Sequence, residues 1–376
     1  MPEFVPGLEL SRIFYLEAVK PILEREFPAL QYSAALIGSG SEVLGFDTEM
    51  SSDHDWGPRV RLFFPDEDDY PREAINEMLR QKLPYLVRGY STNFEPDDSE
   101  GDRGTQLPKN LDRGPVNHLV EMVGIREYFQ QYLGFDIQTE LDAIDWLTIP
   151  QEKLRSVTAG AVYHDGIGLE AVRDRFSYFP PDVWLYLLLC GWTRVGQEEH
   201  LAPRVGYAGD EIGSAIIASR LVRDIMNLCF LMEKTYAPYS KWFGTAFAKL
   251  DCAGELTPIL RNVQRGETWR EREQHLCEAY EYVAEMHNAL GITEKVPAKA
   301  SSFHGRPFKV IHGWRFEEAI REVIRDPILK EISGKRCIGS IDQFSDSVDL
   351  RSSATVRSRL RALYGEQFTR KRVSAV

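Results

Sequence analysis

Residues 36–64 of the chain, LIGSGSEVLGFDTEMSSDHDWGPRVRLFF, combine a glycine turn, an acidic pair and an aromatic run. The apolar residues at 34–37 predict a short buried strand that leads into the turn Gly38-Ser39-Gly40-Ser41. Glycine tolerates positive φ, so this turn is free to adopt an open backbone. The run at 56–64 is rich in aromatic and β-branched residues and predicts a second strand.

Asp53 and Asp55 come directly before that run. At positions i and i+2 of a strand, two side chains project from the same face. Carboxylates that close together raise each other's pKa unless a cation lies between them. Mg²⁺ prefers such oxygen ligands and is usually held by one or two carboxylates plus substrate phosphates. The pair therefore predicts a magnesium site, although a glycine turn or an Asp-x-Asp pair alone is common on solvated surfaces.

The order of these features resembles the signature of the DNA polymerase β-like nucleotidyltransferase superfamily. The matching elements are a strand, Gly40-Ser41-x3-Gly45, Ser52-Asp53-x-Asp55 and a second strand. The wider stretch, Gly-Ser-Gly-Ser-Glu-x-x-Gly-Phe-Asp through Asp-His-Asp-Trp-Gly-Pro-Arg, is similar to a poorly characterised family of bacterial and fungal nucleotidyltransferase-like proteins. Three features depart from the superfamily pattern, one of which is a glutamate, and not an aspartate, as the candidate third acid at 121. The Gly-Ser pair is doubled, and histidine stands between the aspartates where an aliphatic residue is more usual.

Glu121 is the third acidic residue of interest, within the apolar run VNHLVEMVGI at 116–125 that predicts a strand. A carboxylate buried there needs a partner, and the alternative is an edge strand that exposes it to water. In the superfamily, a third carboxylate on a later strand completes an acidic triad, and the resemblance assigns that role to Glu121. His118 lies three residues earlier, points to the opposite face and is predicted to be structural.

Composition favours a two-domain protein of 376 residues, since 43% hydrophobic residues supply proper cores. The net charge of −12 disfavours a chain whose main task is to grip nucleic acid. The five cysteines show no metal-binding spacing and are expected to be free thiols in a reducing compartment. The N-terminus lacks the pattern of a signal peptide, and the longest apolar stretch, 183–192, is too short to cross a bilayer. We therefore expect a soluble cytoplasmic protein without membrane contact.

The pattern changes from mixed α/β to nearly all helical at about residue 130. We expect an α+β fold in which residues 1–130 form a nucleotidyltransferase-type catalytic domain, with a mixed β-sheet and flanking helices. Residues 131–376 are expected to form an α-helical bundle domain with a C-terminal helical extension.

A helix with a kink at Pro21 is predicted at 10–27, and a strand at 85–94. The prolines at 180 and 181 and an N-cap at Asp182 predict a helix at 183–197, and Gly209-Asp210 predict the start of a longer helix. Loops are predicted at 95–114 and 163–168, and the basic tail at 351–372 is predicted to be a solvated helix with a frayed end.

The change at about residue 130 resembles the aminoglycoside-modifying members of the superfamily, in which a helical bundle closes over the nucleotide. There, basic and aromatic bundle residues contact the triphosphate and the base. By position, Arg223 and Lys241 are candidates for phosphate contacts, and Tyr239 for the base or ribose. The spacing differs from that in those enzymes, and a salt bridge of Arg223 with Asp224 or Glu233 is the alternative.

The resemblance implies transfer of a nucleoside monophosphate from an NTP, with ATP as the expected substrate, to a hydroxyl group, releasing pyrophosphate. Asp53, Asp55 and Glu121 would hold two Mg²⁺ ions, or Mn²⁺ in their place. Ser41 and the backbone around Gly40 would bind the β- and γ-phosphates, and Gly45 would permit a close approach of the next segment.

The acidic net charge favours a polar small molecule as the acceptor. The alternatives are a tRNA 3′ end or a protein hydroxyl, as in toxin-like transferases, a non-catalytic nucleotide-binding protein, and a protein of this architecture with an unrelated role. The sequence leaves the acceptor, the preferred NTP and the oligomeric state open.

Overall fold

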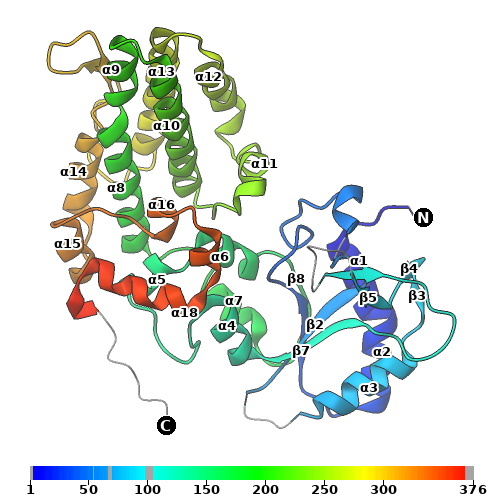
Figure 1. Ribbon diagram of the computed structural model, residues 1–376. Coiled ribbons are helices and arrows are strands. Elements are labelled where there is room, and N and C mark those ends of the chain that lie inside the picture. Colours follow the sequence, from blue (N-terminus) through cyan, green and yellow to red (C-terminus); the bar gives the residue numbers. More distant parts are fainter. Residues whose placement is uncertain (1–2, 54, 67–69, 98–104, 369–376) are drawn as a thin grey trace. The chain divides into compact units, whose positions relative to one another are not determined.

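The computed structural model describes residues 3–53, 55–66, 70–97 and 105–368, with only the backbone described at 52 and 53 (Figure 1). Contacts divide the chain into two compact units, residues 1–140 with 153–177, and residues 141–152 with 178–376. The predicted boundary at residue 130 falls inside helix α4 (Ile125–Leu133). Residues 141–152 belong to the second unit, and residues 153–177 belong to the first again, before the long helices of the second unit begin. The roles assigned to the two domains stay predictions.

A four-stranded mixed sheet forms the centre of the first unit, in the order β7-β2-β1-β8. Its strands are β1 (Ser33–Leu36), β2 (Arg59–Phe64), β7 (Leu119–Gly124) and β8 (Ala161–Asp165). β1 pairs antiparallel with both β2 and β8, whereas β2 pairs parallel with β7. The predicted mixed sheet near the N-terminus is thus confirmed, but the predicted loop at 163–168 is wrong. β8 forms there because its backbone pairs with β1, more than a hundred residues earlier.

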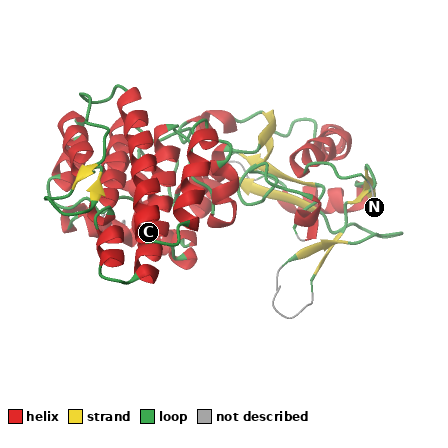
Figure 2. Ribbon diagram, turned by 90° about the horizontal axis from the view of Figure 1, so that it is seen from above, coloured by secondary structure: helices red, strands yellow, loops and turns green. Residues whose placement is uncertain are grey.

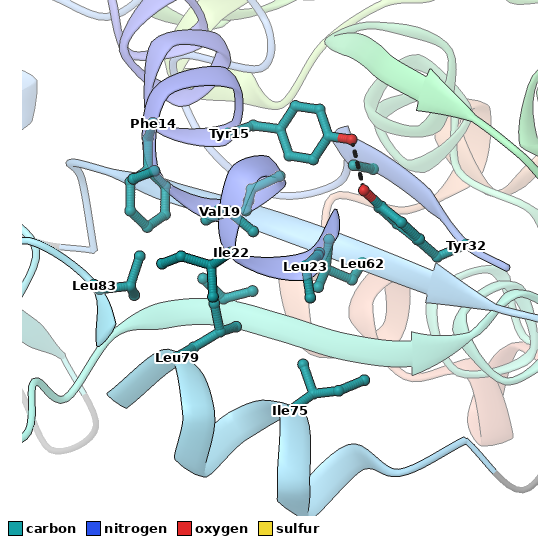
Figure 3. Packing of buried hydrophobic residues seen from close by; sticks show 14 of the residues in the cluster. Phe14, Tyr15, Val19, Ile22, Leu23, Tyr32, Leu62, Ile75, Leu79 and Leu83 are labelled. Atoms are coloured by element: carbon teal, nitrogen blue, oxygen red, sulfur yellow. Dashed lines mark hydrogen bonds between the residues drawn. The ribbon is translucent and has the colours of Figure 1, made fainter. Parts of the chain in front are cut away.

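Helices cover one face of this sheet and form the core of the unit (Figure 3). They are α1 (Gly7–Phe14), the π-helical turn η1 (Tyr15–Val19), α2 (Lys20–Glu26) and α3 (Arg72–Lys82). The predicted kink near Pro21 takes the form of that π-helical turn, which ends where α2 begins. Alternate β2 residues, among them Leu62, point into the cluster. Figure 3 shows the hydroxyl groups of Tyr15 and Tyr32, 3.0 Å apart, satisfying each other inside it.

Two short hairpins replace the longer strand predicted at 85–94 and part of the predicted loop at 95–114. The first joins β3 (Leu86–Val87) to β4 (Tyr90–Ser91), and the second joins β5 (Phe94–Pro96) to β6 (Gln106–Pro108). Arg88 and Gly89 both have positive φ, 53° and 86°, so the chain reverses where a continuous strand was expected. The second hairpin matters for the site described below.

The second unit is almost entirely helical, as predicted (Figure 2). Its principal helices are α5 (Ala143–Thr148), α8 (Pro181–Glu198), α9 (Leu201–Tyr207), α10 (Glu211–Met232), α11 (Phe243–Phe247), α12 (Ala253–Arg265), α13 (Trp269–Ala289), α14 (Trp314–Val323), α15 (Pro327–Ser333), α16 (Ile341–Phe344), α17 (Val348–Ser352) and α18 (Ala354–Arg357). α10 packs against α8 and α13, and α14 against α8 (Figure 1). α10 starts as predicted after Asp210, whose side chain accepts from the Gly213 N–H at 2.7 Å. α8 starts earlier than predicted, because Pro181 is its first residue, and Asp182 accepts from the Arg325 N–H at 3.0 Å and does not cap the helix.

Two further helices lie near the unit boundary. α6 (Gln151–Thr158) crosses from the second unit to the first, and α7 (Leu169–Asp174) follows β8. In the second unit, the short hairpin of β9 (Ser301–Ser302) and β10 (Lys309–Val310) interrupts the helices, and the 3-10 segments η4 (Ser358–Tyr364) and η5 (Glu366–Phe368) end the described chain. Across the described residues, no helix is both long enough and apolar enough to cross a membrane.

The basic C-terminal segment is not the solvated helix that its charge predicted. The Arg361 guanidinium is buried and donates to Asp142 Oδ1 at 2.8 Å, Asp142 Oδ2 at 2.6 Å and Asp145 Oδ1 at 2.6 Å. Arg351 Nη2 likewise donates to Asp342 Oδ1 at 2.8 Å. The prediction failed because two of these carboxylates lie some two hundred residues away in the sequence, where a local charge count does not find them.

Candidate functional site

The glycine turn after β1 has the open backbone that its sequence predicted. Gly38, Gly40 and Gly45 have φ values of 99°, 143° and 67°, which side-chain-bearing residues rarely adopt. The turn closes through a hydrogen bond from the Phe46 N–H to the Ser41 carbonyl at 2.9 Å. A Cβ on Gly40 would lie 2.4 Å from Arg59 Nη2, so a side chain at this position would have to displace the Arg59 guanidinium.

Gly45 differs from the close approach that we expected. Apart from its chain neighbours, no described atom lies within 4 Å of the position that a Cβ on Gly45 would occupy. The positive φ, and not a neighbouring segment, is therefore the reason for glycine at this position.

Two arginines of β2 hold the turn against the sheet. Arg59 Nη2 donates to the Ser39 carbonyl at 2.9 Å, and Arg59 Nε donates to Glu42 Oε1 at 2.7 Å. Arg61 Nη1 donates to the Ile37 carbonyl at 2.7 Å. Because the two arginines are separated by one residue on a strand, they share the face opposite the helices. The turn is thus fixed by two guanidinium groups, neither of which the sequence analysis singled out.

Glu121 is paired with Arg61, its neighbour in the β2–β7 register. Arg61 Nε donates to Glu121 Oε2 at 2.8 Å, and Arg61 Nη2 forms an ion pair with the same oxygen. Burial alone would lower the pKa of Arg61, but the charges of Glu121 and Tyr128 outweigh it and raise that pKa. The side chain of Glu121 is 55% exposed, against 17% for Arg61. Glu121 therefore lies exposed on the edge strand β7, which was the alternative interpretation of the sequence, and a cross-strand arginine is its partner there.

Aromatic residues of α4 complete this face of the first unit. The Arg61 guanidinium lies 4.7 Å from the Tyr128 ring centroid, and Tyr132 stacks on Tyr128 with the centroids 5.5 Å apart. The Tyr132 hydroxyl is 3.4 Å from Ser39 Oγ, and Lys153 Nζ lies 4.1 Å from the Tyr132 ring centroid. Tyr128 and Tyr132 are four residues apart on a helix, and this spacing is the sequence signal that could have indicated that they lie side by side.

The Tyr128 hydroxyl is buried beside the glycine turn. It has no hydrogen-bond partner within the described structure, and burial raises the pKa of Tyr128. A Cβ on Gly38 would lie 2.6 Å from this hydroxyl oxygen. An unpaired buried hydroxyl costs free energy, so a polar ligand atom at the turn would relieve that cost.

Asp53 and Asp55 do not lie on a strand, which corrects the geometry predicted for them. Asp53 is the last residue of the 3-10 turn η2 (Glu49–Asp53), Asp55 has a φ of 48°, and β2 begins only at Arg59. Pro58 has no N–H for a strand ladder, which explains the later start. The argument that the two carboxylates share a strand face therefore does not apply. His54 and the Asp53 side chain lie outside the described residues.

Asp55 instead joins the site to the second hairpin. Its N–H donates to the Gln106 carbonyl at 2.9 Å, and its Oδ1 accepts from the Gln106 N–H at 2.9 Å. Strand β6 is thereby tied to Asp55, four residues before β2 begins. The segment that the sequence presented as a structureless loop borders the acidic motif.

The carboxylates partly meet the requirements of a magnesium site. Their oxygen atoms suit Mg²⁺ in kind. Among the described side chains, however, no three His, Cys, Asp or Glu residues gather as a metal-binding group. The Gln106 N–H donates to Asp55 Oδ1, and Arg61 Nε donates to Glu121 Oε2. One oxygen of each carboxylate is therefore already engaged. The assignment of Asp53, Asp55 and Glu121 as metal ligands stays a prediction.

His118 is half-buried, which is compatible with its predicted structural role. Its Nδ1 accepts from the Val120 N–H at 3.2 Å, and burial lowers its pKa. A neutral imidazole in that position supports the strand backbone.

Arg223 lies on α10 of the second unit and forms a salt bridge with an unexpected partner. Its Nη1 donates to Asp346 Oδ2 at 2.8 Å, which raises the pKa of Arg223 and lowers that of Asp346. The partners weighed from sequence are engaged elsewhere. Asp224 Oδ1 accepts from Arg194 Nε at 3.1 Å, and Glu233 accepts backbone N–H groups of residues 251 and 252.

Tyr239 and Lys241 lie at the surface near η3 (Ser240–Trp242) of the second unit. Tyr239 is 42% exposed, and Lys241 Nζ lies 4.9 Å from the Trp242 ring centroid. Their contact with a nucleotide stays a prediction, as does that of Arg223.

A family model described as a domain of unknown function (DUF4037) matches residues 146–243. The matched segment contains Arg223, Tyr239 and Lys241 but neither the glycine turn nor Glu121. No curated protein matches the chain. A solved nucleotidyltransferase-like protein from Exiguobacterium sibiricum matches at 10% identity, with a TM-score of 0.31, over 79% of this chain and 82% of that one.

Proposed function

We propose that the protein is a magnesium-dependent nucleotidyltransferase that moves a nucleoside monophosphate from an NTP to a hydroxyl of a polar small molecule. One observation carries the proposal. A glycine turn lies between two paired strands, is held by Arg59 and Arg61, and Arg61 is paired with Glu121 on the next strand. The chain order of turn, acidic pair, strand and later acidic strand is the order that the superfamily signature requires.

The residues of the first unit take the following roles. The hydroxyl of Ser41 and the backbone N–H groups around Gly40 bind the β- and γ-phosphates, since an open turn lets donors converge on oxygen. Asp53, Asp55 and Glu121 hold Mg²⁺, which when bound supplies Lewis-acid stabilisation of the triphosphate. In the second unit, Arg223 and Lys241 bind phosphate oxygens, and Tyr239 contacts the base or ribose.

Glu121 also has a role in proton transfer. Arg61 engages Oε2, so Oε1 is the oxygen that accepts the proton of the acceptor hydroxyl. The hydroxyl oxygen then bonds to the α-phosphorus as the bond to the β-phosphate oxygen breaks, and pyrophosphate leaves. Arg61 keeps the carboxylate oriented throughout.

The hairpin of β5 and β6 is the proposed border of the acceptor site. Two hydrogen bonds join Asp55 to Gln106, so an acceptor beside Asp55 would also meet β6. The net charge of −12 favours a small acceptor over a polynucleotide. A second candidate function is that of a non-catalytic nucleotide-binding protein. The observation that favours it is the ion pair between Arg61 and Glu121, which neutralises the carboxylate proposed as the proton acceptor.

Calorimetric titration of each NTP, with and without Mg²⁺, tests the proposal. We expect one NTP to bind the wild type in a metal-dependent way and to lose that binding in the double variant Asp53→Asn/Asp55→Asn. Asp112→Asn is the matched control, since Asp112 is exposed in the same unit, and it should bind as the wild type does. Absence of binding to folded wild type in both Mg²⁺ and Mn²⁺ would overturn the proposal.

A second measurement separates catalysis from binding alone. Glu121→Gln should keep NTP binding but lose pyrophosphate release, in the presence of a pool of polar hydroxyl compounds, by about a hundredfold or more. A wild type that binds NTP and releases no pyrophosphate with any acceptor would establish the non-catalytic function instead.

A further inference from the structure

Cys190 and Cys337 lie together in the second unit although 147 positions separate them in the sequence. Cys190 is buried in the middle of α8, whereas Cys337 is partly exposed in the segment between α15 and α16. The two thiols are close enough to shift each other's pKa. The Cys337 Sγ also donates to the Ser333 carbonyl at 3.5 Å. The spacing along the chain gave no sign of this pair.

The surroundings of the two sulfur atoms are unequal. Arg321 Nη2 lies 3.6 Å from Cys337 Sγ, and a neighbouring guanidinium stabilises a thiolate. The interaction with Cys190 and the contact with Arg321 together lower the pKa of Cys337 to about 7, although burial opposes them. Burial raises the pKa of Cys190. One sulfur is therefore reactive and reachable, and the other is a protonated thiol behind it.

The remaining cysteines, all within the described residues, lack this combination. Cys229 and Cys252 also interact with each other, but both are buried, and the hydrogen bond with Cys252 and burial raise the pKa of Cys229. Burial raises the pKa of Cys277 to about 12. The Cys229–Cys252 pair is thus a natural internal control for Cys190–Cys337.

We propose that Cys337 is a site of oxidation by hydroperoxides and that Cys190 is its resolving partner. The Cys337 thiolate attacks the terminal peroxide oxygen; the S–O bond forms, the O–O bond breaks, and the departing alkoxide takes a proton to become an alcohol. Cys337 is then a sulfenic acid, and the peroxide has been reduced by two electrons. The Cys190 sulfur next attacks the Cys337 sulfur, the S–O bond breaks, and hydroxide leaves with the Cys190 proton as water. A disulfide remains.

The disulfide would fasten the C-terminal segment to α8. That segment already docks there, because Gln343 Nε2 donates to the Leu187 carbonyl at 3.0 Å. The hydroxyl of Tyr364 donates to the Gly339 carbonyl at 2.7 Å, which links the last described helices to the same loop. Oxidation therefore needs little rearrangement and should raise the melting temperature in a way that a reductant reverses.

Peptide mapping of the full chain after treatment with hydrogen peroxide tests the proposal. The wild type and the control Cys252→Ser should form the Cys190–Cys337 disulfide, and dithiothreitol should reverse it. Cys190→Ser should stop at a Cys337 sulfenic acid that dimedone traps, and Cys337→Ser should lose the modification. A Cys229–Cys252 disulfide in its place, or equal labelling of several cysteines in folded protein, would overturn the proposal.

Arg321→Met is a second test that keeps every cysteine. Loss of the guanidinium should slow oxidation of Cys337 by up to about tenfold near neutral pH, because a smaller fraction of the thiol is ionised. Matched melting curves before treatment establish that the variant is folded. An unchanged rate in the folded variant would remove Arg321 from the mechanism and contradict the proposed activation of Cys337.

Discussion

Arg61 on β2 and Glu121 on β7 face each other across a parallel strand pair, and both nitrogen contacts of Arg61 end on the single oxygen Oε2. A third nitrogen of the same guanidinium holds the Ile37 carbonyl at the start of the glycine turn. One side chain thus connects the acidic strand to the turn proposed to bind phosphate. A substitution of Arg61 should therefore affect both the acidic strand and the turn, whereas a substitution of Glu121 should affect the acidic strand alone.

Arg61→Ala should destabilise the first unit more than Glu121→Gln. The alanine variant loses the bonds to Ile37 and Glu121 and the packing on Tyr128, about 2–3 kcal/mol together. Glu121→Gln removes one charge from a largely exposed carboxylate, so we expect about 1 kcal/mol or less. Chemical denaturation measures both. Arg72→Ala, an exposed arginine paired with Glu127, is the control and should change stability by no more than about 0.5 kcal/mol. An Arg61→Ala variant as stable as this control would contradict the connecting role.

Gly40→Ala should be more damaging than Gly45→Ala. Both substitutions place a side chain at positive φ, which costs about 1–2 kcal/mol. At Gly40 the new methyl group also displaces the Arg59 guanidinium, so the total should reach about 3 kcal/mol. Thermal unfolding of the two variants compares them directly. Equal destabilisation of the two variants would mean that displacing the Arg59 guanidinium from the turn has no cost in stability.

The strands that flank the motif were predictable because their signals are local. Apolar runs indicated β1, β2 and β7 to within a few residues, and proline and aspartate indicated the starts of α8 and α10. The delay of β2 to Arg59 also had a signal, since Pro58 offers no N–H to a ladder. That signal was outweighed by the aromatic run that begins at Trp56.

The contacts that form the candidate site were not predictable, because they depend on strand register and on distant pairing. Arg61 can be recognised as the partner of Glu121 only when the register of β2 and β7, which places the two residues opposite each other, is known. β8 is a five-residue strand whose partner is β1. Gly160, with a φ of 77°, marks the end of the preceding helix, but it does not indicate that a strand paired with β1 follows. The hydrogen bonds between Asp55 and Gln106 likewise join a motif to a segment that has no periodic pattern.

Arg361→Ala should release the C-terminal segment from the second unit. The substitution leaves the Asp142 and Asp145 carboxylates without their shared guanidinium, and breaking such a pair costs about 3 kcal/mol. Arg359→Ala is the matched control, because Arg359 is an exposed arginine on the same segment. Limited proteolysis should cut the C-terminal segment faster in Arg361→Ala only. Equal cleavage of both variants would show that the two salt bridges do not hold the segment.

Glu199 should make stability depend on pH between about 4.5 and 7. It is buried at the end of α8, and its carboxylate accepts the N–H groups of Ile311, His312 and Gly313 at 2.7, 3.0 and 3.1 Å. Burial raises the pKa of Glu199 from 4.5 to about 7, against the opposing effect of those hydrogen bonds and of Arg315. Within this window the unfolded chain releases a proton that the folded protein retains. Raising the pH therefore favours unfolding, by at most about 1.4 kcal/mol per pH unit.

Glu199→Gln isolates this effect, because glutamine does not titrate. Glutamine has one acceptor oxygen for three N–H donors, so the variant should be less stable than the wild type at every pH. The difference in unfolding free energy between the two should shrink as the pH rises from 4.5 to 7 and then stay constant. Urea denaturation at intervals of one pH unit measures it, with the exposed Glu318→Gln as the control that keeps the wild-type profile. A difference that grows with pH would mean that the three backbone donors, and not burial, dominate the titration of Glu199.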